Sequence, residues 1–209
     1  MCRHEEGLER IDFFFYCSFM RHFLCFFVFL FLLSGSFSLM AQENYLEQTA
    51  ISLQEGEYRL CWSARKSDGR IFEEFCIQGE SMSKFSSKLV LECAPLGRSI
   101  EEEINKLLVK LAYQKEESIV HNFSQVEIDS LGESHVEYVQ SNVQGGRPFV
   151  VEWNYCRFKI IDNRVLMIQL KRRVYKEELS KFLKLIDKNR QKWIEEFLRY
   201  NMNEIKINK

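Results

Sequence analysis

Two short runs rich in β-branched and aromatic residues predict a β-hairpin early in the folded part of the chain. The first run covers residues 57–65 and the second covers residues 70–77. Asp68-Gly69 lies between them and is typical of a two-residue hairpin turn, because both residues tolerate positive φ angles. This turn fixes a register that places Cys61 opposite Cys76. Alternation along the strands then predicts a buried face made of Leu60, Trp62, Ile71, Phe75 and Ile77.

A third apolar run at residues 88–93 predicts another strand, and the pattern then changes to helical spacing. Ser99 and Glu102 have the spacing of a capping box, which predicts that a helix begins at Ser99. Apolar residues follow at intervals of three and four, so one face of this helix is buried. That face consists of Ile104, Leu107, Leu108 and Leu111. The helix is expected to end between residues 115 and 118.

Strand patterns return from residue 119 and are followed by a closing helix. The strand runs cover residues 124–129, 135–141, 149–161 and 165–171. Turn residues separate them, at Gly132, Gly145-Gly146 and Asp162-Asn163. The final helix is expected over residues 176–200. Its apolar stripe is Leu179, Phe182, Leu183, Ile186, Trp193, Ile194 and Phe197.

The element order β-β-β-α-β-β-β-β-α predicts an α+β fold. Strands joined by tight turns pair antiparallel, so we expect one twisted antiparallel sheet of about six or seven strands with two helices packed on it. Residues 42–200 are expected to form this single domain, followed by a flexible tail over residues 201–209.

This order and its hydrophobic pattern resemble the PsbP-like fold family, over roughly residues 50–195. The resemblance is carried by the strand at 88–93, the Pro95 loop, the Ser99 helix, Val126-Glu127-Ile128, Gly132, the strand pair around Asp162-Asn163, and the closing helix with Phe182 and Trp193. The resemblance implies a mostly non-catalytic domain that binds or stabilises protein assemblies. No functional motif matches, so the resemblance implies no site residue.

The N-terminal region has the pattern of a secretory signal peptide. Arg21 and His22 precede an unbroken apolar run over residues 23–33. A run of this length suits the hydrophobic region of a signal peptide and is short for a membrane span. Residues 20–41 are therefore expected to be removed by cleavage after Ala41, with cleavage after Ser38 as the alternative.

The residues before Met20 do not fit a signal peptide, because charges of both signs precede a segment interrupted by Asp12. Residues 1–19 are therefore interpreted as an extension that is not translated, with translation starting at Met20. The alternative is an extended N-terminus in which residues 13–40 act as an uncleaved anchor. That anchor would be the only expected contact with a membrane. The domain itself is expected in the periplasm or outside the cell.

Four cysteines remain after residue 41: Cys61, Cys76, Cys93 and Cys156. An even number of cysteines in an exported domain suggests two disulfides. The hairpin register favours Cys61–Cys76, and elimination leaves Cys93–Cys156. The alternatives are a neighbouring pair of reduced thiols at Cys61 and Cys76, or a longer turn that shifts the register.

Charge and motifs argue against several classes of function. The formal net charge is −1 with both signs spread along the chain, which does not favour nucleic-acid binding. The basic run Lys171-Arg172-Arg173 is interpreted as a solvated strand end. Gly79-Glu80-Ser81 begins like a nucleophile elbow but lacks the second glycine. His135 and Glu137 could supply two metal ligands, yet an exposed histidine on a strand is the favoured interpretation.

No cofactor, metal or catalytic group is therefore expected, and the sequence favours a non-enzymatic protein. The leading hypothesis is an exported binding or assembly-accessory domain whose partner is an envelope or secreted protein. The alternative is a carrier or sensor of a small hydrophobic ligand held between the sheet and the helices. An unrecognised hydrolase that uses His121 or His135 as a base is the third hypothesis.

Overall fold

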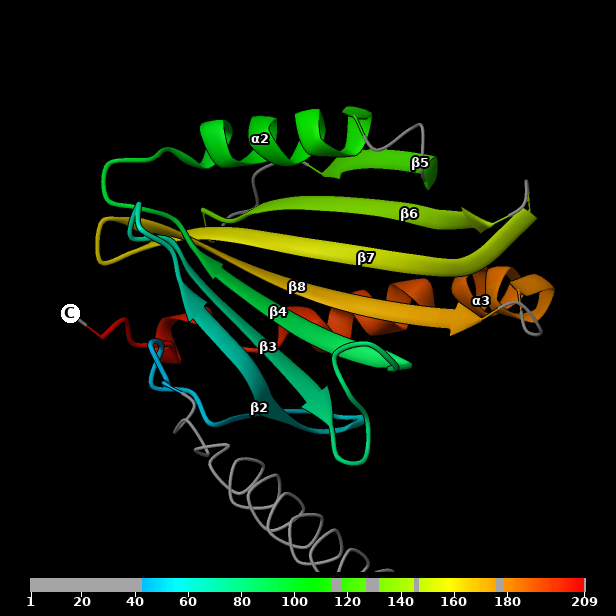
Figure 1. Cartoon of the computed structure of the whole chain (residues 1–209), viewed down its shortest axis with the longest axis horizontal. Helices are drawn as coiled ribbons and strands as arrows, with labels where there is room; N and C mark the ends of the chain where they lie inside the picture. The colour runs from blue at the N-terminus through cyan, green and yellow to red at the C-terminus, as the bar shows by residue number, and fades with distance from the viewer. Residues whose placement is uncertain (1–42, 114–117, 127–131, 145–146, 176–178, 209) are drawn as a thin grey trace, which may run out of the picture. The chain divides into compact units, whose positions relative to one another are not determined.

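The part of the chain that the structure describes contains one eight-stranded antiparallel sheet in the order β1-β2-β3-β4-β8-β7-β6-β5 (Figure 1). The structure is a computed structural model, and it describes residues 43–208 except 114–117, 127–131, 145–146 and 176–178. The strands are β1 (Ala50–Leu53), β2 (Gly56–Arg65), β3 (Ile71–Ile77), β4 (Ser87–Cys93), β5 (Ser118–Val126), β6 (Ser134–Gln144), β7 (Arg147–Ile161) and β8 (Arg164–Tyr175). The predicted α+β class and antiparallel sheet are confirmed. The proposed signal peptide at residues 20–41 and the extension at residues 1–19 lie outside the described residues.

The sheet consists of two antiparallel meanders that meet in the middle. β1 to β4 form the first meander and β5 to β8 form the second, and the pairing of β4 with β8 joins them. The short strand β1 was not predicted, which accounts for the larger number of strands. The Asp162-Asn163 turn has positive φ angles at both residues, as a two-residue hairpin between β7 and β8 requires.

The helices α2 (Ile100–Tyr113) and α3 (Leu179–Leu198) cover opposite faces of the sheet. The predicted capping box at the start of α2 is confirmed: the Glu102 amide donates to Ser99 Oγ at 3.1 Å, and the Ser99 amide donates to Glu102 Oε2 at 2.9 Å. In Figure 1, α2 lies above β5 and β6, whereas α3 lies behind β7 and β8. Both faces of the central strands are therefore covered.

Two hydrophobic cores follow from this arrangement. The larger core packs α3 against one face of the sheet and contains Phe182, Ile186, Trp193, Ile194 and Phe197 from the predicted stripe. Leu183 was predicted in that stripe but is 51% exposed. The smaller core packs Ile104 and Leu111 of α2 against the opposite face.

The first hairpin has a different register from the predicted one. The turn contains three residues, Ser67 to Gly69, because the Lys66 amide donates to the Arg70 carbonyl and Arg65 pairs with Ile71. A β-bulge then falls between Leu60 and Trp62, so Arg59 lies opposite Cys76. The predicted pairing of Cys61 with Cys76 as opposite residues is therefore wrong. The bulge also turns Trp62 outward, where it is 38% exposed.

The C-terminal segment is folded, which corrects the predicted flexible tail. A short 3-10 helix, η3 (Met202–Glu204), buries Met202, and Ile205 is buried after it. The Asn208 amide donates to the Tyr45 carbonyl at 2.9 Å. The two ends of the described chain therefore pack together. Among the described residues, no helix is long and apolar enough to cross a membrane.

Candidate functional site

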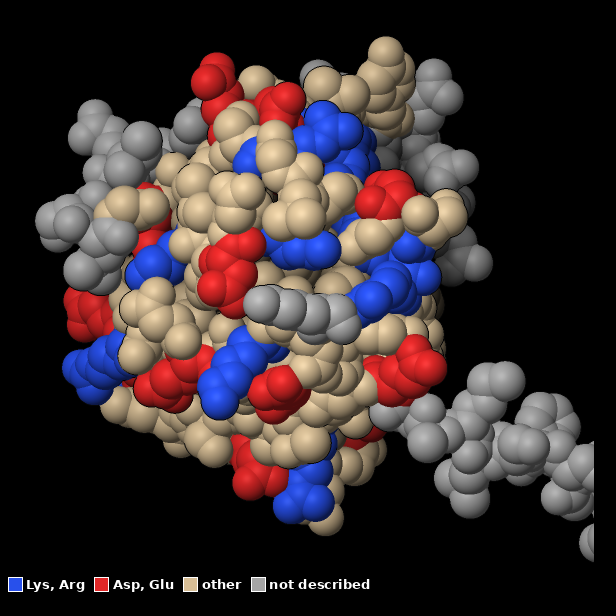
Figure 2. All heavy atoms as spheres, turned by 90° about the vertical axis from the view of Figure 1, so that its left-hand side faces the viewer, with Lys and Arg blue, Asp and Glu red and all other residues tan. Residues whose placement is uncertain are grey.

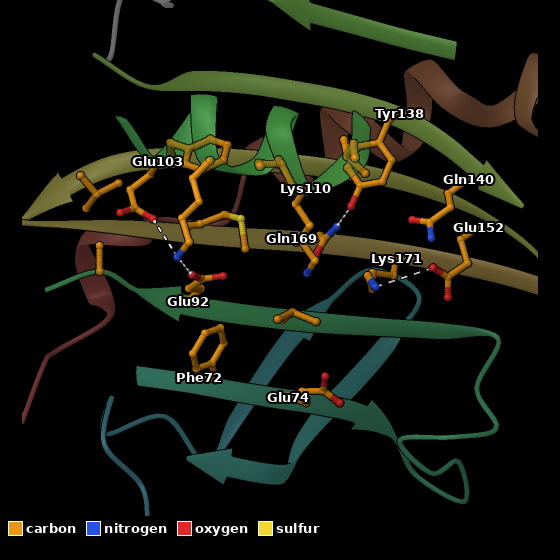
Figure 3. A pocket seen from close by; sticks show the side chains of 18 of the residues that line it. Phe72, Glu74, Glu92, Glu103, Lys110, Tyr138, Gln140, Glu152, Gln169 and Lys171 are labelled. Atoms are coloured by element: carbon orange, nitrogen blue, oxygen red, sulfur yellow. Dashed lines mark hydrogen bonds and ion pairs between the residues drawn. The ribbon is translucent and has the colours of Figure 1, made fainter. Parts of the chain in front are cut away.

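A cavity of about 460 Å³ lies between α2 and the sheet (Figure 3). Side chains from α2, β3, β4, β6, β7 and β8 line it. Its volume falls in the range of roughly 300–1,000 Å³ that is usual for small-molecule sites.

The face of β8 determines the polarity of the cavity. Alternate residues of a strand point to the same face, and Val165, Met167, Gln169 and Lys171 all line the cavity. Their side chains change from apolar to polar to cationic along the strand. The cavity therefore has an apolar end, an amide-lined middle and a cationic end.

The apolar end is formed by Ala94, Leu107, Phe158, Val165 and Met167. An ion-pair cluster borders it, because Arg70 Nη1 lies 2.6 Å from both Glu92 Oε1 and Glu103 Oε2. Burial raises the pKa of Glu103, but hydrogen bonds and charge from Arg70 outweigh it, so this pKa lies below its ordinary value. Glu103 therefore attaches α2 to β4 and to the start of β3 through Arg70.

The middle of the cavity contains a hydrogen-bonded group of neutral side chains. Gln169 Nε2 donates to Tyr138 Oη at 2.7 Å and to Asn154 Oδ1 at 3.0 Å. Burial raises the pKa of Tyr138 well above its ordinary value, so the phenol stays protonated. Cys156 is fully buried in the adjoining core, and burial raises its pKa to about 12. A thiol with this pKa is protonated at neutral pH and is a poor nucleophile.

The cationic end is lined by Lys171 with the carboxylates of Glu74 and Glu152, and Lys88 and Arg173 pair with these carboxylates from outside the lining. Lys88 Nζ lies 2.8 Å from Glu74 Oε2, and Arg173 Nη2 lies 2.5 Å from Glu152 Oε1. Lys171 Nζ lies farther away, 3.7 Å from Glu152 Oε2. Burial lowers the pKa of Lys171, and the nearby charges of Lys88 and Arg173 lower it further, while Glu152 opposes the shift.

The outer surface differs from this interior. Figure 2 views the side that lies on the left in Figure 1, and it shows acidic and basic side chains interspersed over that face. The sequence predicted that the basic run Lys171-Arg172-Arg173 is a solvated strand end. This prediction is wrong for Lys171 and Arg173. Lys171 and Arg173 are only 22% and 18% exposed, and both face Glu152.

A protein-family model matches residues 47–202. The chain belongs to this family. The matched region contains every residue that lines the cavity, from Lys66 to Lys171. No curated protein matches the chain.

The four cysteines of the family domain are free thiols in the structure. Cys61 lies at the bulge, where its Sγ is 3.2 Å from the Glu74 carbonyl oxygen and adjoins the Cys76 thiol. A Cys61–Cys76 disulfide therefore stays a prediction that this proximity supports. Cys93 and Cys156 belong to different hydrophobic cores, on strands β4 and β7 that β8 separates. This placement argues against the pairing of Cys93 with Cys156.

His135, one of the two histidine candidates, does not face the cavity. His135 is buried, not exposed as predicted, and its Nδ1 lies 2.9 Å from Tyr155 Oη on the α3 side of the sheet. Glu137 on the same face accepts from Trp153 Nε1 at 2.7 Å and also pairs with Arg190. The side chain of His121 lies outside the described residues. Within the described part of the chain, no three potential metal ligands come together.

Sequence reasoning missed the cavity residues because they come from six separate elements. One signal was present, namely the alternation from Val165 to Lys171 on a strand that was correctly predicted. Side chains that change from apolar to cationic along one strand face indicate that this face belongs neither entirely to the hydrophobic core nor entirely to the solvent-exposed surface. The cavity lies between the sheet and α2, and its lining is more polar than a hydrophobic ligand requires.

Proposed function

We propose that this domain is a non-catalytic carrier or sensor that binds one small amphipathic molecule in the cavity beneath α2. The graded face of β8 carries the proposal. An apolar group would lie between Leu107 and Met167, and a polar group would lie beyond Gln169. A molecule with an apolar and a polar part matches both ends at once.

The chemistry of the lining favours binding over catalysis. The carboxylates of Glu92, Glu103 and Glu152 are each paired with a basic side chain, which disfavours their use as general bases. The adjoining thiol of Cys156 is protonated at neutral pH. These groups are suited to fixing the orientation of a ligand by charge and hydrogen bonding.

The proposed place of action is outside the cytoplasm. This part of the proposal rests on the signal-peptide pattern of residues 20–41. The assembly-accessory role, which the family resemblance implies, stays a separate prediction that needs a protein partner.

The proposal is tested with N-phenyl-1-naphthylamine, a neutral probe whose fluorescence increases in apolar sites. The protein is purified from cells that express the full chain, and the probe is titrated into it. Saturable binding of one probe per chain is expected. Leu107→Trp places a large ring in the cavity and should abolish that binding.

Val109→Trp is the matched control, because Val109 is on the same helix but is 54% exposed and does not line the cavity. It should bind the probe like the unmodified protein. Equal binding by both variants, or no saturable binding by the unmodified protein, would contradict the proposed function. Far-ultraviolet circular dichroism would establish that each variant is folded.

A further inference from the structure

We infer that the ligand is a carboxylate with an apolar tail, and that Lys171 and Lys110 bind its carboxylate group at the cationic end of the cavity. This inference rests on the proposed function and specifies the chemical class of the ligand. It is carried by four observations: the local charge balance, the register of β4 and β8, the hydrogen bonding of Lys171 and the direction of Lys110.

The first observation is an excess of positive charge at the cationic end. Among the described residues, three basic side chains share the two carboxylates of this end: Lys88 pairs with Glu74, and both Lys171 and Arg173 pair with Glu152. All five side chains are at most 22% exposed. Water therefore screens the excess charge less than it would at the surface. A bound anion would neutralise it.

The second observation is that Lys88 and Lys171 lie directly opposite each other in the pairing of β4 with β8. Like charges in directly opposite positions destabilise a sheet. Phe85 partly compensates, because its ring lies 4.5 Å from Lys88 Nζ and 3.9 Å from Arg173 Cζ. Lys171 takes no part in that contact, so it is the cation that a ligand would compensate.

The third observation concerns the ammonium group of Lys171. An ammonium has three hydrogens to donate. Within the described part of the chain, Lys171 Nζ forms no hydrogen bond, and its ion pair with Glu152 Oε2 at 3.7 Å exceeds hydrogen-bond length. Arg173 already binds the other oxygen of Glu152, with Nε 2.6 Å from Oε1. Lys171 therefore keeps donors that can be directed at a ligand in the cavity.

The fourth observation is a second amine on the opposite wall. Figure 3 shows Lys110 extending from α2 into the cavity toward Gln169, while Lys171 extends from β8 on the other side of Gln169. Two amines that approach from different elements can bind the two oxygens of one carboxylate. Leu107 lies one helical turn before Lys110, so a tail attached to that carboxylate would run toward Leu107 and Met167.

The inference is tested by competition between three compounds with the same tail: octanoate, octanol and octylamine. Each is titrated against bound N-phenyl-1-naphthylamine at neutral pH. Octanoate should displace the probe at a concentration about tenfold or more below that of octanol, because charge-assisted hydrogen bonds add affinity. Octylamine should be the weakest competitor, because it brings a cation to a cationic site.

Three variants locate the effect. Lys171→Met and Lys110→Met should each reduce the preference for octanoate over octanol, whereas octanol affinity stays unchanged. Lys106→Met is the matched control: it removes a cavity lysine whose ammonium is paired with Glu92 and Glu103 near the apolar end. It should keep the preference. If Lys171→Met does not fold, Lys110→Met decides the test alone, because Lys110 is an exposed residue on α2.

The outcomes separate the two proposals. Equal competition by octanol and octanoate, with the probe still bound in the cavity, overturns the carboxylate inference and leaves the binding function standing. A preference for octanoate that both lysine variants retain also overturns it. Failure of the neutral probe to bind in the cavity would contradict the proposed function itself. A preference that is lost in either variant and kept in Lys106→Met supports the inference.

Discussion

Arg157 and Glu133 form a buried ion pair, with Arg157 Nη2 2.7 Å from Glu133 Oε2 and both side chains only 2% exposed. Arg157 Nη1 also donates to the carbonyl oxygens of Phe197 and Tyr200, at 2.7 Å and 2.9 Å. One guanidinium therefore binds the segment before β6 and satisfies carbonyl groups at the end of α3. The Phe197 carbonyl also accepts from the Tyr200 amide at 3.2 Å, so this contact holds the turn that ends α3.

Arg157→Leu should be strongly destabilising, because it removes a charge-paired guanidinium from a carboxylate that is only 2% exposed, and the ammonium of Lys159 lies farther away, at 3.3 Å. Removing one partner of a buried pair typically costs about 3–5 kcal/mol. Urea unfolding followed by tryptophan fluorescence measures this loss.

Arg59→Leu is the matched control, since Arg59 and Glu57 form an exposed pair. It should change the free energy of unfolding by less than about 1 kcal/mol. Similar losses in both variants would show that Arg157 does not fix α3 as described.

A second prediction concerns Glu73, which is buried in the larger core. Its Oε1 accepts from the Tyr45 and Leu46 amides at 2.7 Å and 3.0 Å, while Oε2 has no hydrogen-bond partner among the described residues. Burial raises the pKa of Glu73 above its ordinary value of 4.5. Glu73→Gln keeps the acceptor and removes the charge, so it should be at least as stable as the unmodified protein at pH 7. Glu73→Ala should lose about 1–3 kcal/mol because both amides lose their acceptor.

The raised pKa of Glu73 also predicts how the contribution of this residue to stability changes with pH. Between pH 4.5 and the raised pKa, the folded protein holds a proton on Glu73 that the unfolded chain has released. The contribution of Glu73 to stability therefore increases as the pH falls through the raised pKa and decreases as the pH rises. On acidification, the free energy of unfolding of the unmodified protein should therefore increase relative to that of Glu73→Gln. A difference that is constant between pH 7 and pH 4.5 would contradict the raised pKa.

A third prediction concerns the thiols at the bulge. Peptide mapping without reduction, on protein recovered from an oxidising compartment, should link Cys61 to Cys76 and leave Cys93 and Cys156 unlinked to each other. The loop closed by such a bridge is short, and a bridge of this kind contributes about 3 kcal/mol to stability. Reduction should therefore lower the unfolding temperature. A link from Cys61 to Cys93 or Cys156 would show that the hairpin is paired differently from the structure.

A fourth prediction concerns the capping box of α2. Ser99→Ala removes the hydroxyl that accepts from the Glu102 amide, and should cost about 1 kcal/mol. Ser99→Asp keeps an acceptor at that position and should be close to neutral. Thermal unfolding of the two variants compares them directly, and equal unfolding temperatures would mean that the cap contributes little.

Local sequence signals predicted most of the fold. The capping box at Ser99 and the Asp162-Asn163 turn depend on residues within a few positions of each other, and both are confirmed. The bulge at Cys61 was not predictable in the same way. It depends on how β2 packs between β1 and β3, and β1 itself is only four residues long. The three-residue turn shifts the pairing by one position and the bulge shifts it by one more, so Cys76 lies opposite Arg59.

The cavity depends even more on long-range contacts. Its cationic end exists because β4 lies beside β8, and hydrophobic patterns do not specify which strands become neighbours. Lys88 and Lys171 each looked like an ordinary polar residue in its own strand, and only the pairing of the two strands brings them together. The buried tail at Met202 was missed for a similar reason, because its packing partners lie in the larger core and not in the neighbouring sequence.

The central pairing of β4 with β8 also has a consequence for how the protein folds. Each meander contains contacts between consecutive strands, so each can form quickly, whereas the joining of β4 to β8 must close a long loop that contains α2 and three strands. The cavity spans this junction and exists only after the two halves have joined. A ligand bound in the cavity would contact both halves of the sheet. It would therefore slow the separation of the halves more than it would speed their assembly.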